Sequence, residues 1–249
     1  MHAERPSILC FCLLLNFTLF AQTTTLFAQT TTNMEGYIRA QIGSDSRLFN
    51  GREYIRNGTP AKGFPYFEWD SLIPGSLIYD GISYDIPLEY DLAQDQLVIR
   101  NYADNILISL VAEKTNHFSI GPFHFRYFSP GTNSKISSGS NSGTNHSQEP
   151  GFYQELFTGN RVTLLARRHK NLVFPSTNEE QPQYVQINTY VLLLDGNSYK
   201  IGSEKELLNV LGDKKEELKK YIRKNHVSFK HHLEGSITQT IAYYQQLKS

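Results

Sequence analysis

Cysteine is almost absent from this 249-residue chain, and its two cysteines, Cys10 and Cys12, both lie near the start. Residues 1–28 have the pattern of a secretory signal, with Arg5 in a short polar start followed by an apolar run. We expect this segment to be removed, which leaves a secreted chain without cysteine. Packing must then hold the fold, and a cysteine nucleophile and a thiolate metal site are excluded.

Long hydrophobic runs are lacking as well. The apolar stretch Ile8–Phe20 is shorter than the roughly 20 residues that span a bilayer. The sequence therefore predicts no transmembrane span in the secreted chain. The repeat Thr-Leu-Phe-Ala-Gln-Thr-Thr occupies residues 18–24 and again 25–31, so the cut can follow Ala21 or Ala28.

A lipid anchor on one of the two cysteines is the alternative for this segment. Lipidation signals carry small residues just before the modified cysteine, whereas Leu9 and Phe11 are bulky. We therefore expect a periplasmic or extracellular protein without an anchor.

An excess of either charge is also missing, since 24 Lys and Arg balance 24 Asp and Glu. Nucleic acids are recognised through a basic surface. The balance therefore predicts no nucleic-acid partner. Two local basic runs occur at residues 167–170 and 214–224, and we interpret both as solvated surface rather than as sites for anionic lipid or glycan.

The clearest structural pattern lies in Ile82–Asp91, where apolar residues alternate with polar ones. This period of two indicates a strand with one buried face. Pro87 cannot donate to a neighbouring strand, so we expect it at an edge or a bulge. Further strands are predicted at Gln96–Arg100, Ile106–Val111, Phe118–Phe128, Tyr184–Leu194 and Tyr199–Ile201.

The predicted fold class is α+β, with a mainly antiparallel meander and a C-terminal segment of three helices; a curved sheet or half-barrel is one form that the meander can take. Hairpins are expected at Asn50-Gly51 and at Asp195-Gly196. Ser203 and Glu206 form a capping box that begins the first helix. The predicted regions are 1–28 signal and duplicated cleavage region, 33–128 antiparallel β region, 129–150 flexible Ser/Gly/Asn-rich loop or linker, 151–202 further strands of the same body, and 203–249 helical segment.

Aromatic residues are abundant, with 15 Tyr and 15 Phe but a single Trp. They gather in two clusters that either pack as an ordinary core or line a cavity for an apolar ligand such as a lipid. The candidate ligand-binding residues are Phe64, Tyr66, Phe67, Trp69, Phe123 and Phe125.

Motifs for catalysis and for metals are missing. The chain has no HExxH, no G-x-S-x-G, no P-loop and no Rossmann glycine pattern. Asp80, Asp85, Asp91 and Asp95 lie near turns but lack the ligand spacing of a calcium loop, so turn chemistry is the favoured interpretation. We predict no metal, no cofactor and no catalytic residue, although a triad assembled from distant residues stays open.

Several phrases of the sequence resemble uncharacterised secreted proteins of Bacteroidota. The likeness covers nearly all of the secreted chain. It implies an envelope or secreted location, and it implies no activity and no catalytic residue. The phrases are Leu48–Tyr54, Tyr79–Gly81, Leu88–Asp91, Gly151–Leu156 and Tyr199–Asn225.

Taken together, these features favour a non-enzymatic secreted or periplasmic envelope protein with an interaction or structural role. Its expected partner is an envelope protein or a lipid. The first alternative is a carrier that holds an apolar ligand in a curved sheet. The second is a hydrolase of envelope polymers with paired carboxyl groups.

Overall fold

The computed structural model describes residues 47–128, 135–136, 146–147, 149–176 and 180–248. The chain divides into two units, one of residues 1–46 and 102–104 and one of residues 47–101 and 105–249, and all elements below belong to the second. The predicted signal segment 1–28 lies outside the described residues.

The strands are β1 (Arg52–Glu53), β2 (Ile73–Tyr79), β3 (Ile82–Asp91), β4 (Gln96–Asn101), β5 (Ile106–Ser109), β6 (Thr115–Ile120), β7 (Phe123–Phe128), β8 (Lys135–Ile136), β9 (His146–Ser147), β10 (Gly151–Thr158), β11 (Val162–Val173), β12 (Gln183–Leu194) and β13 (Asn197–Ile201). The helices are α2 (Glu204–Val210), α3 (Lys215–Lys224) and α4 (Leu233–Lys248), with short 3-10 turns η1 (Arg47–Phe49), η2 (Ala112–Lys114) and η3 (Gly212–Lys214).

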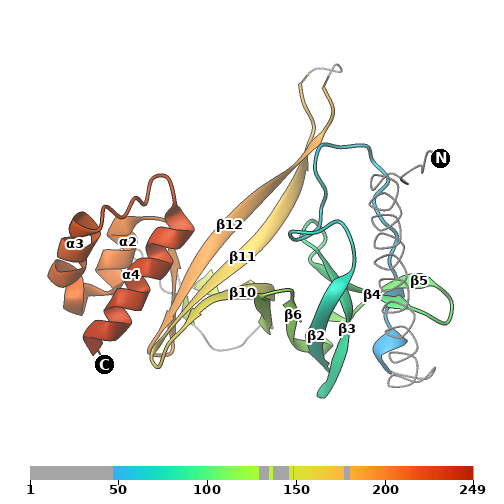
Figure 1. Cartoon of the computed structure of the whole chain (residues 1–249), viewed down its shortest axis with the longest axis horizontal. Coiled ribbons are helices and arrows are strands. Elements are labelled where there is room, and N and C mark those ends of the chain that lie inside the picture. The colour runs from blue at the N-terminus through green and yellow to red at the C-terminus, as the bar shows by residue number, and fades with distance from the viewer. Residues whose placement is uncertain (1–46, 129–134, 137–145, 148, 177–179, 249) are drawn as a thin grey trace, which may run out of the picture. The chain divides into compact units, whose positions relative to one another are not determined.

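Eleven of these strands form an antiparallel meander that does not close, and three helices follow it (Figure 1). This confirms the predicted fold class. The strand order is β1-β5-β4-β3-β2-β6-β7-β10-β11-β12-β13. Neighbours are consecutive in the chain except where β1 pairs with β5, β2 with β6, and β7 with β10. At the far end β8 pairs parallel with β13, and β9 pairs with β8. Both short strands lie in the stretch predicted as a loop or linker, and the rest of 129–148 is outside the described residues.

Strand β3 follows its predicted alternation only in part. Leu88 and Tyr90 are fully buried on one face, but Glu89 and Asp91 on the other face are buried too. They are covered because an isolated bridge brings Tyr66 against Asp91. Pro87 is tolerated because β4 pairs only with the end of β3, from residue 89 on, so β3 has a single neighbouring strand at Pro87.

One strand prediction and one hairpin prediction were wrong, and a second hairpin prediction is confirmed. The predicted strand Phe118–Phe128 is a hairpin broken at Gly121, which has a φ of 54°. Asn50-Gly51 makes no hairpin, because Gly51 packs directly against Ser109 of β5. The predicted hairpin at Asp195-Gly196 is confirmed. Asp195 and Gly196 have φ values of 50° and 79° and join β12 to β13, as expected of a tight hairpin.

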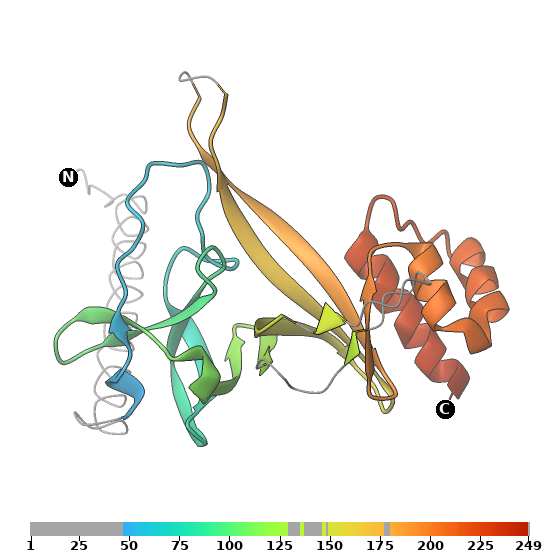
Figure 2. The ribbon, with the colours of Figure 1, turned by 180° about the vertical axis from the view of Figure 1, so that it is seen from behind.

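The helices pack on one face of β11–β13. Ser203 caps α2, since its Oγ accepts a hydrogen bond from the N–H of Glu206 at 3.2 Å. Apolar residues of the sheet and of all three helices share one core, which explains why the helices lie grouped beside β13 in Figures 1 and 2. The core includes Leu164, Leu192, Leu207, Leu218 and Ile241, all fully buried.

A second core is aromatic. Tyr90 of β3 contacts the rings of Phe118, Phe125 and Phe152 edge-on, at centroid distances of 5.3, 5.3 and 5.7 Å. These residues come from four different strands, so the rings bind β3 to β6, β7 and β10. Edge-to-face aromatic pairs add about 0.5–1.5 kcal/mol each beyond their buried area.

Replacing Leu164 by alanine tests the helix-facing core. Leu164 is 0% exposed, and truncation of such a residue costs about 2–5 kcal/mol of unfolding free energy. Denaturant titration is the measurement, and Ile82→Ala is its control because Ile82 is 49% exposed and should change stability by less than about 0.5 kcal/mol. Equal losses in the two variants would contradict this packing.

Candidate functional site

Strands β11 and β12 pair without interruption over all 12 residues of each. Their neighbours are shorter. Strand β10 pairs with β11 only as far as Arg167, and β13 pairs with β12 only from Tyr190 on. Residues 168–173 and 183–189 therefore continue beyond the neighbouring strands as a two-stranded ribbon, visible in Figures 1 and 2. We call this pair of segments the ribbon.

One face of the ribbon is anchored at its base. The Arg168 guanidinium donates to both carboxylate oxygens of Glu234 in α4, at 2.7 and 3.0 Å, and to the Gln154 side chain at 2.7 Å. Arg168 is only 7% exposed. A bidentate arginine–carboxylate pair of this kind is a strong and directional contact, so it fixes the ribbon's base to the last helix.

Lys170 anchors the same face further out. Its ammonium donates to the carbonyl oxygens of Phe64 and Tyr66 at 3.1 and 2.6 Å. Burial lowers the pKa of Lys170. Together with the buried Arg168, this overturns the interpretation of residues 167–170 as a solvated basic surface. The run is a set of internal contacts, because alternation along β11 aims these cations at the carboxylate and the carbonyls beneath the ribbon.

The opposite face of the ribbon carries three exposed apolar side chains, with the polar residues His169 and Asn171 directly across from two of them. Val173, Val185 and Ile187 are 44%, 38% and 49% exposed. These three residues share one face. Val185 pairs with Asn171 and Ile187 pairs with His169, and both partners lie an even number of residues before Val173 on β11. Phe174, just after β11, is 67% exposed. Exposed apolar side chains are ordinary when single, but a contiguous group indicates an interaction surface.

The outer edge of β12 has a gap in its pairing. On one side of the gap the N–H of Tyr184 donates to the carbonyl of Lys62, and on the other Tyr190 pairs with Ile201. Because the groups at one edge belong to alternate residues, the N–H and C=O of Gln186 and Asn188 face outward between them. No strand of the described chain pairs with these groups.

This edge also lacks the usual protection. Natural edge strands carry charged residues, Pro or bulges that prevent another strand from adding. Residues 183–194 contain no charged residue, and their register with β11 has no bulge. The edge of β12 is therefore suited to accept a further strand.

The six predicted ligand-binding aromatics pack against one another and against the sheet. Phe67 is 2% exposed and meets Phe123 and Phe125 edge-on at 5.0 and 5.1 Å. Trp69 lies 6.0 Å from Phe123, and Phe64 lies 6.4 Å from Tyr66. The rings thus interdigitate in the way of a core, and they do not line either of the two pockets described for this chain.

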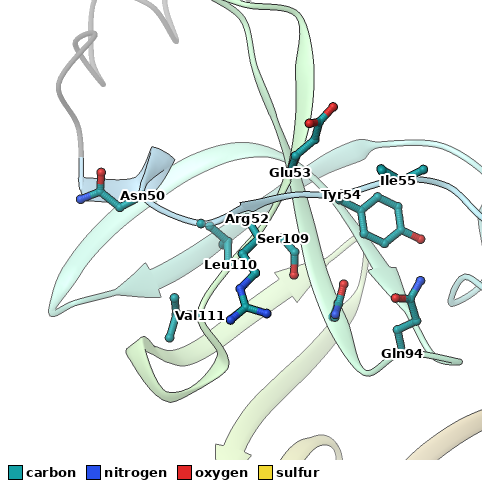
Figure 3. A pocket seen from close by; sticks show the side chains of 11 residues that line it. Asn50, Arg52, Glu53, Tyr54, Ile55, Gln94, Ser109, Leu110 and Val111 are labelled. Atoms are coloured by element: carbon teal, nitrogen blue, oxygen red, sulfur yellow. The ribbon is translucent and has the colours of Figure 1, made fainter.

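A pocket of about 520 Å³ lies beside β1, between β5 and the turn that follows β3 (Figure 3). Arg52, Gln94, Gln96 and Ser109 contribute polar groups to its lining. Figure 3 shows Arg52 pointing down past Leu110, whereas Glu53 points the opposite way. These groups can donate hydrogen bonds to a small polar molecule, and none of them was singled out from the sequence.

Behind the pocket lies a buried polar network. The hydroxyl of Tyr54 donates to Asp91 at 2.6 Å, and the Gln94 side-chain amide donates to the same oxygen at 2.9 Å. Burial, together with this bond to Asp91, raises the pKa of Tyr54 far above its usual range. The network holds the segment after β1 on the end of β3, which gives the pocket a fixed wall.

Glu89 lies in the same buried layer. It is 1% exposed and accepts a hydrogen bond from Arg56 at 2.7 Å, while its second oxygen has no hydrogen-bond partner among the described residues. Burial raises the pKa of Glu89, and the charge of Arg56 offsets this only in part. Glu89 and Asp91 thus sit under the covering segment, in contact with arginine, tyrosine and glutamine.

Within the described ranges, no three histidine, cysteine or acidic residues are grouped to hold a metal ion. No helix of the part of the chain that the structure describes is long and apolar enough to cross a membrane.

One sequence pattern distinguishes the ribbon and did not enter the predictions. The charge-free stretch 181–194 follows directly on two glutamates and lies opposite the basic run of β11. The free edge itself depends on how far β13 extends along β12, which no local pattern indicates.

Comparison of the chain with protein-family models, with curated proteins and with solved structures found no match. The site is therefore argued from its own geometry.

Stability against pH tests the burial of Glu89. A folded-state pKa raised above the ordinary 4.5 means that the native chain binds this proton more tightly than the unfolded chain does. The resulting stability is fully present below pH 4.5 and is lost as the pH rises through the raised pKa. Glu89→Gln cannot titrate, so its unfolding free energy relative to the parent should increase over that window. Asp85→Asn, at an exposed carboxyl of the same strand, is the control, and a difference that stays flat or falls would contradict the assignment.

Proposed function

We propose that this is a non-enzymatic protein of the bacterial envelope, secreted or periplasmic, whose interaction role is exerted by the ribbon. The partner is a protein that adds a β-strand to the outer edge of β12. Strand addition derives affinity from backbone hydrogen bonds and specificity from side chains at alternate positions.

The observation that carries this proposal is the coincidence of three properties in residues 185–189. Their edge has outward N–H and C=O groups without a neighbouring strand in the described chain, their sequence has no charge, and Val185 and Ile187 are exposed apolar side chains. Each property alone is ordinary, but all three together match the requirements of a strand-pairing surface.

The envelope location is supported by the pattern of the first 28 residues and by the resemblance to secreted proteins of Bacteroidota. A protein there meets other envelope proteins. The ligand carrier and the hydrolase gain no support from the described contacts, since the aromatic rings interdigitate and Glu89 and Asp91 lie under a covering segment.

A photo-crosslinking residue at position 187, in the full chain expressed in its own cells, tests the proposal. We expect an adduct in the envelope fraction that is several-fold stronger than the adduct from position 82. Ile82 is the matched control because it is also 49% exposed, at the end of a different hairpin. Adding Gln186→Pro, which removes one outward N–H, should abolish the adduct. Equal labelling from positions 187 and 82 would contradict the proposal.

A further inference from the structure

The pocket beside β1 lies over one face of the sheet, and the strand register determines which residues share that face. Arg52 of β1 pairs with Ser109 of β5, and Ser109 pairs in turn with Val98 of β4. Residues that pair across strands share a face, as do residues two apart along one strand. Gln96 therefore lies on the same face, and three polar side chains from three strands meet at one pocket.

The guanidinium of Arg52 is available to a ligand. Arg47 and Arg56, its neighbours along the chain, both form ion pairs with carboxylates. Arg52 forms no ion pair and no hydrogen bond with any residue that the structure describes. Its neighbour Glu53 points the opposite way (Figure 3), as alternation along a strand requires. The N–H donors of Arg52 are therefore left at the edge of the pocket without a protein acceptor.

Asp91, the carboxylate behind the pocket, is already occupied by other donors. One of its oxygens accepts hydrogen bonds from the Tyr54 hydroxyl and the Gln94 side chain, and the other accepts from the N–H groups of Ala93 and Gln94. The bond to Asp91 uses the amide nitrogen of Gln94, so the side-chain oxygen of Gln94 is left as an acceptor. The pocket lining thus combines donors at Arg52 with an acceptor at Gln94.

We propose that this pocket binds a small organic carboxylate that also carries a hydroxyl or amino group. The planar fork of Arg52 matches a carboxylate through two parallel hydrogen bonds, and Ser109 and Gln96 are further polar partners on the same face. The hydroxyl or amino group of the ligand donates to the side-chain oxygen of Gln94. None of these residues belongs to the ribbon, so the inference does not depend on the strand-pairing function.

The rest of the lining sets the size and the class of the ligand. Leu110 and Val111 contribute apolar groups, which suit the carbon skeleton of an organic acid. The volume of about 520 Å³ falls within the range of about 300–1,000 Å³ that is usual for small-molecule sites. Phosphate groups are bound by several cations together or by helix N-termini. The described lining has one arginine and no helix, which favours a carboxylate over a phosphate.

Ligand-observed NMR on the purified full chain tests this site. The probes are 3-hydroxybenzoate, mandelate and glucuronate, each a carboxylate with a hydroxyl group, together with the neutral amide of each acid. We expect saturation transfer to at least one acid, with a dissociation constant on the order of 10 µM to 1 mM. The matching amide should bind at least about tenfold more weakly, because it cannot accept the charged fork.

Arg52→Gln is the deciding variant. Arg52 is exposed and has no partner in the described chain, so its replacement should keep the fold, which an unchanged melting temperature verifies. Binding of the acid should fall at least about tenfold, whereas binding of the amide should not change. Arg47→Gln is the matched control, because it removes the same charge from an exposed arginine outside the pocket. It should change the affinity for the acid by less than about twofold, since exposed charges are screened by salt.

The other outcomes overturn the inference. An acid and its amide that bind equally, or an acid that binds equally to the parent chain and to Arg52→Gln, would show that the guanidinium does not hold a carboxylate. Equal losses in Arg52→Gln and Arg47→Gln would assign the effect to overall charge rather than to the pocket. Failure of all three acids to bind below about 10 mM would remove the site.

Discussion

The uninterrupted pairing of β11 with β12 is the constraint on which the rest of this structure depends. Because both strands are longer than their neighbours, one half of the pair lies inside the sheet and the other half continues as the ribbon. The inner half supplies the face on which α2, α3 and α4 pack. The outer half presents the free edge. A single pair of strands thus serves both the core and the proposed interface.

Buried polar contacts determine which way the ribbon faces. Arg168 is bound to α4 through Glu234, and Lys170 is bound to the carbonyls of Phe64 and Tyr66. Breaking a buried, hydrogen-bonded charge pair leaves a charge without compensation, which is strongly destabilising. The face with Arg168 and Lys170 is therefore held inward, and the face with Val185 and Ile187 is left to solvent.

Sequence patterns predicted the antiparallel sheet, the three helices and the Asp195-Gly196 hairpin, because alternation, capping and turn chemistry are local signals. They failed where the outcome depends on distant packing. Asn50-Gly51 is a strong turn signal, yet the chain there lies against Ser109. The basic run of β11 looks solvated until Glu234 and the carbonyls near Tyr66 are placed beside it. The aromatic residues were identified correctly as clusters, but whether rings interdigitate or surround a cavity is a tertiary property.

The central claim is that the outward edge of β12 meets another strand. Amide hydrogen exchange of residues 185–189 tests it most directly, since an unpaired edge amide exchanges quickly and a paired one is protected. The account predicts that protection of this segment rises when its envelope partner is added, while the segment around Ile82 is unchanged. Fast exchange of Gln186 and Asn188 under all these conditions would contradict it.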